Sequence, residues 1–381
     1  MRSQVSEVIA VRQRSIPEDM VICFIIEMRS LDNPLAGDLD HILQHTEGLW
    51  DELRGKRIFI TGGTGFVGCW LLESLLWANK QLKLNVEATI LTRNPSAFMA
   101  KVPHIAANPA VQIWKGDVCS FTFPEGEFSH VIHAATESDA VSNRDRPLEM
   151  LQTIVNGTQR TLEFAVHCKA RKFLFLSSGA VYGQQPPDIS HISEEYKGAP
   201  DPMDPLAAYH NGKRMAEHLC LQYGREFSLP VTIARCFAFV GPYLPLDRHF
   251  AIGNFISDGL RGGPIIVKGD GSPYRSYLYA ADLAIWLWTI LLRGQPFRPY
   301  NVGSEKAYSI AEIAQLVASA FAPPPPVQIL ERLVSGKLAE RYVPSTQRAE
   351  TELDLRQTID LLTAIEKTIR WHQRTFGKSP C

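Results

Sequence analysis

The sequence predicts an α/β fold in which a doubly wound parallel sheet is combined with a smaller, irregular α+β lobe. Three observations support this prediction. Short apolar strands alternate with helical patterns over residues 55–237, a glycine-rich turn joins the first strand to the first helix, and the alternation stops after residue 237. Such alternation is typical of parallel sheets that helices cover on both faces, and 381 residues are enough for two lobes.

Residues 1–54 are predicted to be an extension that precedes the sheet. We expect residues 1–27 to be disordered and outside the fold, with Met28 as an alternative start of the chain. Over residues 38–53 apolar side chains recur at nearly helical spacing, which predicts a short helix.

The predicted sheet domain occupies residues 55–237. Its strands are expected at residues 58–60, 86–92, 111–116, 130–135, 172–178 and 231–237. A long helical pattern over residues 148–168 separates the fourth strand from the fifth, and the other gaps also leave room for helices.

Residues 238–381 are predicted to form mainly the second lobe, with segments that return to the sheet. Prolines and glycines become frequent there, and a short strand is expected at residues 264–269. Residues 322–326 read APPPP, which indicates a stiff loop. The amphipathic pattern over residues 358–376 predicts a closing helix.

Composition excludes several classes of function. The net charge is −1, so no sequence-wide basic field attracts nucleic acid or an acidic membrane surface. The most apolar short run, residues 20–26, is much shorter than the roughly 20 residues that a membrane span needs. The seven cysteines include no C-x-x-C pair and no cysteine–histidine cluster with zinc-ligand spacing. We therefore expect a cytoplasmic enzyme with no metal site and no nucleic-acid or membrane partner.

The turn after the first strand is the strongest local signal. Gly62, Gly65 and Gly68 are spaced G-x-x-G-x-x-G, with an apolar strand before them and an apolar helix after them. Such a turn lets the backbone approach a pyrophosphate, to which the helix N-terminus offers N–H groups and a positive dipole. A glycine turn without a ligand is the alternative, but the flanking elements favour a Rossmann-type dinucleotide site. The predicted cofactor contacts in this turn are Gly62, Thr64, Gly65, Phe66, Val67 and Gly68.

The residues at the end of the second strand should select the cofactor. A carboxylate there would bind the adenosine ribose hydroxyls, whereas a basic side chain would pair with a 2′-phosphate. The sequence has Thr92 followed by Arg93 and no carboxylate. We therefore favour NADP over NAD, although Arg93 as a solvated loop residue is the alternative.

Two further strand ends are predicted to contact the cofactor. Asp117 follows the third strand and is placed to bind the adenine amino group, with Val118 beside it, although a turn aspartate is the alternative. Ala134 and Ala135 end the fourth strand and are expected to contact the dinucleotide as well.

Tyr209 and Lys213 are four residues apart on a predicted helix and therefore share one face. A free tyrosine ionises near pH 10, but a nearby ammonium and an oxidised nicotinamide both favour the phenolate, so the phenol can serve as an acid/base. Lys213 can also reach the nicotinamide ribose, so both residues are expected to contact the cofactor.

Gly212 lies between Tyr209 and Lys213 and costs about 1 kcal/mol relative to alanine in a helix. We expect it to let the cofactor or another backbone come close.

Ser178 ends the fifth strand, at the edge where doubly wound sheets bind ligands. Its hydroxyl is predicted to bind the same substrate oxygen that Tyr209 protonates or deprotonates. The neighbouring Ser177 is the alternative for this role.

The glycine turn, the strand-end serine and the Y-x-x-x-K motif together resemble the extended short-chain dehydrogenase/reductase family, in its nucleotide-sugar epimerase/dehydratase branch. The resemblance covers most of residues 55–375. It implies that a hydride moves between a nicotinamide and a sugar carbon, usually C4, while the tyrosine handles the hydroxyl proton. It also implies a nucleotide-sugar substrate and a homodimer joined through helices that include the Y-x-x-x-K one.

The resemblance extends to the segments expected to bind substrate. Residues 235–242 look like the family's R-x-x-N-x-x-G-P segment, but Ala238 stands in the asparagine position. Residues 269–284 and the segment around Asn254 look like the family's nucleotide-diphosphate elements. Asn254 and Arg275 are therefore predicted to bind phosphate, for which the guanidinium fork is suited. A surface ion pair is the alternative for Arg275.

One departure from the family bears on the reaction. Members that eliminate water usually carry Asp-Glu directly after the strand-end serine or threonine, and decarboxylating members keep the glutamate. Here these positions are Gly179 and Ala180, which cannot move a proton. We therefore predict a 4-keto-sugar reductase or a C4 epimerase, and Thr92–Arg93 slightly favours the reductase. The alternatives are a 4,6-dehydratase or decarboxylase, a reductase of a non-nucleotide carbonyl, and a non-catalytic cofactor-binding sensor.

Overall fold

The computed structural model describes residues 33–136, 140–247, 250–332, 336 and 338–376. The expectations about residues 1–27 and a start at Met28 lie outside these residues. Residues 42–381 form one compact unit, which contains the sheet and the predicted site.

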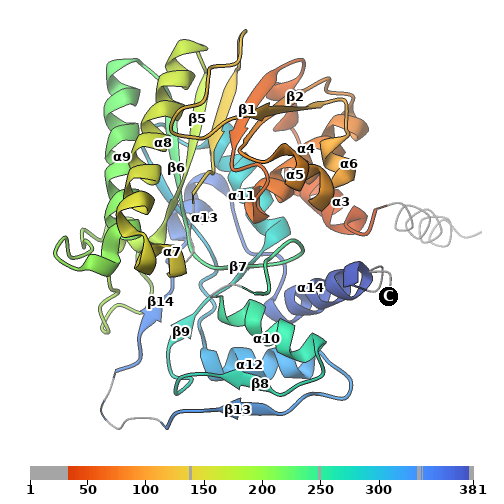
Figure 1. The fold of residues 1–381 in the computed structure, drawn as a ribbon, viewed down its shortest axis with the longest axis vertical. Helices are drawn as coiled ribbons and strands as arrows, with labels where there is room; N and C mark the ends of the chain where they lie inside the picture. The colour runs from red at the N-terminus through yellow and green to blue at the C-terminus, as the bar shows by residue number, and fades with distance from the viewer. Residues whose placement is uncertain (1–32, 137–139, 248–249, 333–335, 337, 377–381) are drawn as a thin grey trace, which may run out of the picture. The chain divides into compact units, whose positions relative to one another are not determined.

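A seven-stranded parallel sheet forms the centre of this unit, in the order β11-β6-β5-β4-β1-β2-β3 (Figure 1). The strands are β1 (Arg57–Thr61), β2 (Glu87–Thr92), β3 (Val111–Lys115), β4 (His130–His133), β5 (Lys172–Ser178), β6 (Val231–Cys236) and β11 (Pro299–Val302). The predicted doubly wound parallel fold is confirmed. The strand order reverses between β1 and β4, and such reversal points are where parallel sheets bind ligands.

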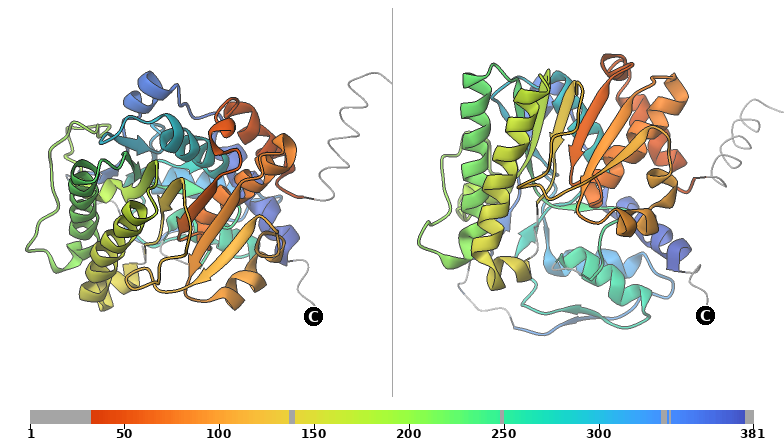
Figure 2. Two further views of the ribbon diagram at one scale, coloured as in Figure 1. Left: turned by 90° about the horizontal axis from the view of Figure 1, so that it is seen from above. Right: turned by 45° about the horizontal axis from the view of Figure 1, so that its top comes forward.

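Helices cover both faces of the sheet (Figure 2). On one face, α8 (Pro147–His167) and α9 (Ala208–Glu226) pack together and against β4 and β5. On the other, α4 (Phe66–Leu82) and α11 (Ala280–Arg293) pack together, and α11 contacts β5 and β6. The core under α8 includes a cluster of aromatic rings: Phe59, Phe121, Phe128 and Phe164. The short helices α5 (Pro95–Lys101) and α6 (Pro103–Ala106) contact β3 at the edge.

Shorter strands follow the sixth strand of the sheet. β7 (Phe239–Val240) pairs with β10 (Leu278–Tyr279), and β9 (Tyr274–Arg275) lies between β12 (Tyr308–Ser309) and β14 (Arg341–Tyr342). β8 (Ile265–Val267) pairs with β13 (Val327–Ile329), and α10 (Ala251–Leu260) and α12 (Ile310–Ser319) pack against β8, in the lower part of Figure 1. Further helices are α7 (Ala140–Asp145), α13 (Gln347–Leu353) and α14 (Leu361–Phe376), the last being the predicted closing helix. The domain boundaries at residues 54 and 237 remain predictions.

The continuous helix predicted over residues 38–53 is wrong. The chain instead forms α3 (Ala36–His45) and, after a turn, a 3-10 helix at Trp50–Leu53. Gly48 separates the two because its φ of +73° lies in the left-handed region, which a right-handed helix cannot include. The indole of Trp50 donates to Thr46 Oγ1 at 2.8 Å.

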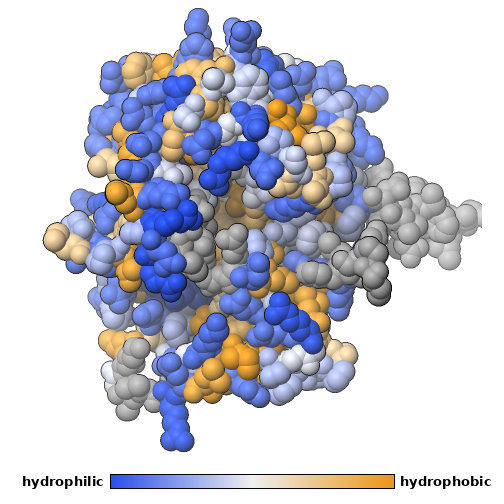
Figure 3. Space-filling view, viewed as in Figure 1, coloured by the Kyte–Doolittle hydropathy of each residue, from blue (hydrophilic) through white to orange (hydrophobic). Residues whose placement is uncertain are grey.

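The face in Figure 3 carries mainly hydrophilic residues, with apolar ones scattered among them. Among the described residues, no helix combines the length and the apolar character needed to cross a membrane. The same residues contain no group of three or more histidine, cysteine or acidic side chains placed to hold a metal ion.

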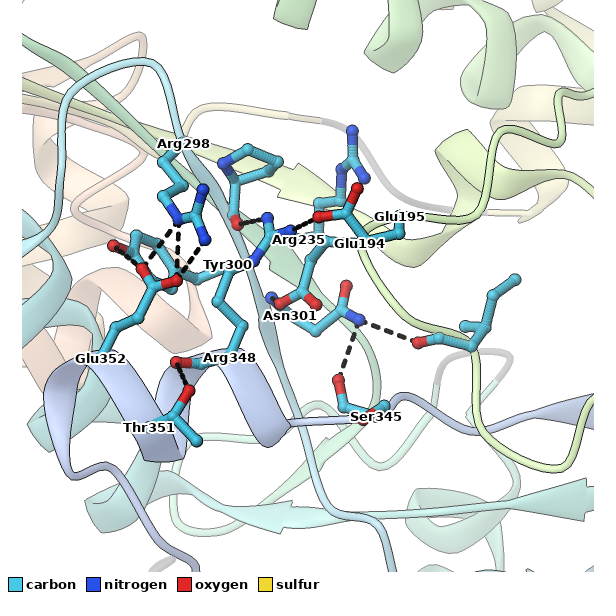
Figure 4. Close-up of polar contacts among 12 residues, drawn as sticks. Glu194, Glu195, Arg235, Arg298, Tyr300, Asn301, Ser345, Arg348, Thr351 and Glu352 are labelled. Atoms are coloured by element: carbon cyan, nitrogen blue, oxygen red, sulfur yellow. Dashed lines mark hydrogen bonds and ion pairs between the residues drawn. The ribbon is translucent and has the colours of Figure 1, made fainter.

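A buried polar network ties the C-terminal segment to the sheet (Figure 4). The Asn301 side chain accepts the Tyr182 hydroxyl at 2.7 Å. It donates to the carbonyls of Ile192 and Ser345 at 2.9 and 3.0 Å. Arg235, on β6, donates to the Tyr182 hydroxyl at 3.0 Å. Because Ser345 lies three residues after the end of β14, the network holds the segment that follows β14 beside the central sheet.

Replacing Asn301 by alanine is expected to lower the free energy of unfolding by about 3 kcal/mol, because a buried hydroxyl and two carbonyls lose their partner. Urea unfolding measures this change. Thr351→Ala is the control, because this exposed hydroxyl donates to the carbonyls of Gln347 and Arg348, both within α13. It should change stability by less than about 0.5 kcal/mol. Equal losses for the two variants would contradict the role of the network.

Candidate functional site

The glycine turn lies between β1 and α4, against the end of β4. Gly62 has φ +72°, and a Cβ on it would lie 2.5 Å from the carbonyl carbon of Ala134. A Cβ on Gly68 would lie 2.4 Å from Gly62 O. Both glycines are therefore required by the packing of the chain on itself. Gly65 differs, since its Cβ would meet only Gly62 O, at an ordinary 3.4 Å.

Gly65 is the N-cap of α4. Neither its φ nor internal packing requires glycine there, so the bare backbone at the start of a 17-residue helix leaves space for a ligand. N–H groups at such a helix start bind anions, and a glycine lets a pyrophosphate come close. The predicted contacts Phe66 and Val67 form the first turn of α4. The turn therefore fits a dinucleotide.

Two further residues organise this turn and were not predicted. Thr61, the last residue of β1, accepts the N–H of Ala134 with its carbonyl and the N–H of Ala135 with its hydroxyl, each at 3.1 Å. The ammonium of Lys101 donates to Thr64 O at 2.9 Å. Thr61 is visible in the sequence as the residue before the glycines, whereas no motif marks Lys101.

The residues expected to bind adenosine lie at the ends of β2 and β3. Thr92 is buried, and its Oγ1 accepts the N–H of Asn94 at 3.3 Å, whereas Arg93 is exposed. Asp117 Oδ1 accepts the N–H of Cys119 at 2.9 Å, so part of this carboxylate stabilises its own turn. Val118 packs against Gly157 of α8, where a Cβ would lie 2.9 Å from a Val118 methyl. The contacts of these residues with a cofactor remain predictions.

Ser178 and Tyr209 meet at the carboxyl end of β5. The buried Ser178 Oγ accepts the N–H of Ala180 at 3.2 Å. Burial raises the pKa of Tyr209 to about 12, and a hydrogen bond with Ser178 opposes this rise. Ser177 is directed elsewhere, since its hydroxyl donates to Glu217 at 2.6 Å. The geometry therefore favours Ser178 over Ser177 for the predicted role.

A second tyrosine joins this pair and was not predicted. Tyr342 Oη lies 3.4 Å from Ser178 Oγ, and the Tyr342 ring packs against Phe237 at a tilt, with centroids 4.6 Å apart. Burial raises the pKa of Tyr342, and Ser178 and Tyr209 are among the groups that affect it. No sequence motif links Tyr342 to Tyr209, because contacts between distant segments, among them the pairing of β14 with β9, place Tyr342 here.

Lys213 is 2% exposed and lies one turn after Tyr209 on α9. Its ammonium donates to Thr136 Oγ1 at 2.6 Å and to Leu176 O at 2.7 Å. Burial lowers the pKa of Lys213 to about 8. Within the protein, the hydrogen bond from Ser178 is the interaction that favours the phenolate of Tyr209. The interactions within the protein therefore do not support the expectation that Lys213 eases the ionisation of Tyr209.

Gly212 is expected from the sequence to let the cofactor or another backbone come close, and the structure places helix α8 against it. A Cβ at this position would lie 3.2 Å from methyl carbons of both Leu151 and Ile154 on α8. Gly212 therefore allows α8 and α9 to pack closely, and it does not face a cofactor site.

Of the two predicted phosphate residues, Arg275 lies close to Tyr342. Arg275 is the strand partner of Tyr342 in the pairing of β9 with β14, and its charge opposes the burial effect on the pKa of Tyr342. Its ion pair with Glu340 is 3.8 Å long and half-exposed, so it contributes little. Asn254 lies in the first half of α10. The backbone of Ile252, at the start of α10, hydrogen-bonds Tyr277, so α10 lies against the segment that carries Arg275.

A protein-family model described as "NAD dependent epimerase/dehydratase family" matches residues 58–303. The chain belongs to this family. The resemblance expected from the motifs is confirmed.

Curated relatives of this epimerase/dehydratase chain include two decarboxylases. UDP-glucuronic acid decarboxylase 1 of Danio rerio is 29% identical over 84% of this chain and 73% of the relative. UDP-glucuronic acid decarboxylase 1 of Arabidopsis thaliana is 27% identical over 82% of this chain and 69% of the relative. The protein is thus an enzyme of a nucleotide-sugar family, while the reaction differs among its members.

Solved structures of family members share the fold. The epimerase Mth375 of Methanothermobacter thermautotrophicus has a TM-score of 0.72 at 22% identity, covering 88% of this chain and 97% of that one. UDP-glucuronic acid 4-epimerase of Bacillus cereus, in complex with NAD, has a TM-score of 0.68 at 20% identity, covering 85% and 99%. At such identity the likeness supports the fold alone. NAD(P) dependence is common to the family, and the preference for NADP is not established by it.

The glycine turn of this family member gives a matched pair of variants. Gly65→Ala is expected to change the free energy of unfolding by no more than about 1 kcal/mol, yet to weaken NAD(P)H binding about tenfold or more, because a methyl enters the space left for pyrophosphate. Gly68→Ala should destabilise by about 3 kcal/mol, because its Cβ meets backbone atoms. Urea unfolding and nicotinamide fluorescence titration measure the two effects. Unchanged cofactor affinity in Gly65→Ala would contradict the assignment of this turn.

The ionisation of Tyr209 gives a second test. Without cofactor, the phenol should titrate near its raised pKa of about 12. With NAD⁺ bound, the positive charge should lower the midpoint by about 1–3 units. Phenolate absorbance, taken as the difference between the protein and Tyr209→Phe, measures both midpoints. Identical midpoints with and without NAD⁺ would show that the nicotinamide charge does not lie beside this phenol.

Proposed function

We propose that this protein moves a hydride at C4 of a nucleotide-activated sugar, as a 4-keto-sugar reductase or a C4 epimerase. The observation that supports this best is the closed space at residue 179. A Cβ on Gly179 would lie 2.6 Å from the Phe237 ring and 2.8 Å from Tyr342 Oη. An aspartate here would require both of these rings to move, and the next residue is Ala180. The site therefore offers proton transfer by phenols and hydroxyls but no carboxylic acid at these two positions.

Tyr209, Ser178 and Lys213 each have one role in this proposal. In reduction, Tyr209 donates its phenolic proton to the C4 oxygen, and in oxidation it accepts that proton. Ser178 donates a hydrogen bond to the same oxygen and limits its charge in the transition state. Lys213 holds the cofactor ribose and fixes the distance between the phenol and the sugar. The bound nicotinamide supplies or accepts the hydride.

The substrate contacts support a nucleotide sugar over another carbonyl compound. Arg275 is the strand partner of Tyr342 in the pairing of β9 with β14, which puts a guanidinium beside the Tyr342 phenol. Arg275 and Asn254 are proposed to bind the diphosphate, because a fork-shaped cation binds phosphate oxygens in pairs. A ketone without a nucleotide would have no need for them.

The cofactor and the assembly are part of the proposal. The exposed Arg93 after β2 favours NADP, through a pair with the 2′-phosphate. The solved B. cereus epimerase, by contrast, contains NAD. The homodimer and the cytoplasmic location expected from the sequence remain predictions.

Decarboxylation of a nucleotide-linked uronic acid is the second candidate, and the D. rerio and A. thaliana decarboxylases favour it. Oxidation at C4 of such a sugar gives a β-keto acid, which loses CO₂ to leave an enolate that must then be protonated at C5. Gly179 and Ala180 carry no acid for that protonation, which makes this candidate weaker than the first.

The proposal predicts turnover of nucleotide sugars without loss of carbon. The purified protein is incubated with nucleotide 4-ketosugars and NADPH, and with UDP-hexoses or UDP-glucuronic acid and NAD⁺, followed by product analysis. Reduced or C4-epimerised products are expected, and Tyr209→Phe should lower kcat by about 10²–10⁴-fold. Tyr300→Phe is the control, since this phenol bonds Glu352 outside the site.

Release of CO₂ from UDP-glucuronic acid with formation of a UDP-pentose would support the second candidate and reject the first. Full activity of Tyr209→Phe would reject the acid/base assignment.

A further inference from the structure

Tyr342 is the component of the site that the proposed reaction does not yet use. Its hydroxyl is 3.4 Å from Ser178 Oγ and occupies the space that a side chain at residue 179 would need. Its ring lies on Phe237. A partly buried phenol in contact with a proposed catalytic hydroxyl calls for a physical role.

The backbone around Tyr342 is held in place. The N–H of Val343 donates to Gln185 Oε1 at 2.9 Å, and the carbonyl of Val343 accepts the N–H of Ile192 at 2.9 Å. The carbonyl of Ser345 accepts from Asn301 at 3.0 Å, as Figure 4 shows. The phenol therefore reaches Ser178 from a fixed segment.

The hydrogen-bonding capacity of Ser178 makes the direction of this contact important. A serine hydroxyl has one proton and two lone pairs. The N–H of Ala180 already occupies one lone pair. If Tyr342 donates to the other, the single Ser178 proton is left for the oxygen of Tyr209 or of a substrate. If Ser178 donates to Tyr342, the Ser178 proton is no longer available to the oxygen of Tyr209 or of a substrate.

The surroundings of Tyr342 favour the first direction. Among the described residues, Ser178 Oγ is the hydrogen-bond partner of Tyr342 Oη, so it is the acceptor that these residues offer to the phenol proton. Burial raises the pKa of Tyr342, although the hydrogen bond with Ser178 and the charge of Arg275 oppose the rise, so the phenol keeps this proton. Cys236, the other titratable group beside both phenols, has a pKa raised by burial to about 12 and stays neutral. The ammonium of Lys213 is held by Thr136 and Leu176.

We propose that Tyr342 is a positioning residue whose hydroxyl donates to Ser178 and thereby directs the Ser178 proton toward the oxygen of Tyr209 and of the bound substrate. The inference rests on the proposed function, because it concerns the hydroxyls of Ser178 and Tyr209 that carry the proposed reaction. It adds a third hydroxyl, from the far end of the chain, that acts on the reaction only through Ser178.

The test is a double-mutant cycle on the ionisation of Tyr209 with NAD⁺ bound. Phenolate absorbance is recorded for the wild type, Tyr342→Phe, Ser178→Ala and the double variant. The corresponding protein that also carries Tyr209→Phe is subtracted from each. Because a directed hydrogen bond favours the phenolate, Tyr342→Phe should raise the midpoint by about one unit. Ser178→Ala should raise it at least as much, and the double variant no further than Ser178→Ala.

Tyr300→Phe serves as the control and should leave the midpoint unchanged, because it removes a phenol hydroxyl elsewhere. Replacing Tyr342 by 3-fluorotyrosine keeps the shape of the ring but makes the hydroxyl a stronger donor, so it should lower the midpoint. This second substitution keeps the test decisive if Tyr342→Phe folds poorly.

A midpoint in Tyr342→Phe equal to that of the wild type, or effects of the two substitutions that add, would overturn the inference. Failure of the proposed function gives a different result. A protein that binds NAD⁺ but turns over no nucleotide sugar would reject the function, and the titration would still decide the role of Tyr342.

Discussion

Burial of a phenol and an ammonium beside the same strand end governs the chemistry of this site. Burial lowers the pKa of Lys213 to about 8 and raises that of Tyr209 to about 12, so the protein alone disfavours the charged form of each. The proton therefore stays on the phenol near neutral pH until hydrogen bonds and the charge of a ligand change the balance. Within the protein, the Ser178 hydroxyl is the group that favours the phenolate of Tyr209.

The topology of the sheet explains why these groups meet. The glycine turn follows β1 at the point where the strand order reverses, and Gly62 packs directly on Ala134 at the end of β4. The parallel strand β5 ends at the same edge, which brings Ser178 to it. The Asn301 network then fixes the C-terminal segment beside the sheet, so Tyr342 completes the cluster.

The fold and half of the site could be predicted because their signals are local. Each strand of the sheet up to β6 is a short apolar run, and the glycine turn and the Y-x-x-x-K motif are complete within a few residues. Contacts between distant segments leave no such signal. Tyr342 and Lys101 reach the site through pairing and packing that no spacing encodes, and the neighbour of Gly212 proved to be a side chain of α8. The break at Gly48 depends on one backbone angle.

The most direct measurement is a crystal structure of the protein with NAD⁺ and a nucleotide-diphosphate sugar. The sugar C4 oxygen should lie within about 2.6–3.2 Å of Tyr209 Oη, with Ser178 Oγ also in hydrogen-bonding contact with it and the diphosphate on Arg275. A complex in which the C4 oxygen lies beyond the reach of Tyr209, while another carbon of the sugar faces the nicotinamide, would contradict hydride transfer at C4 through this phenol.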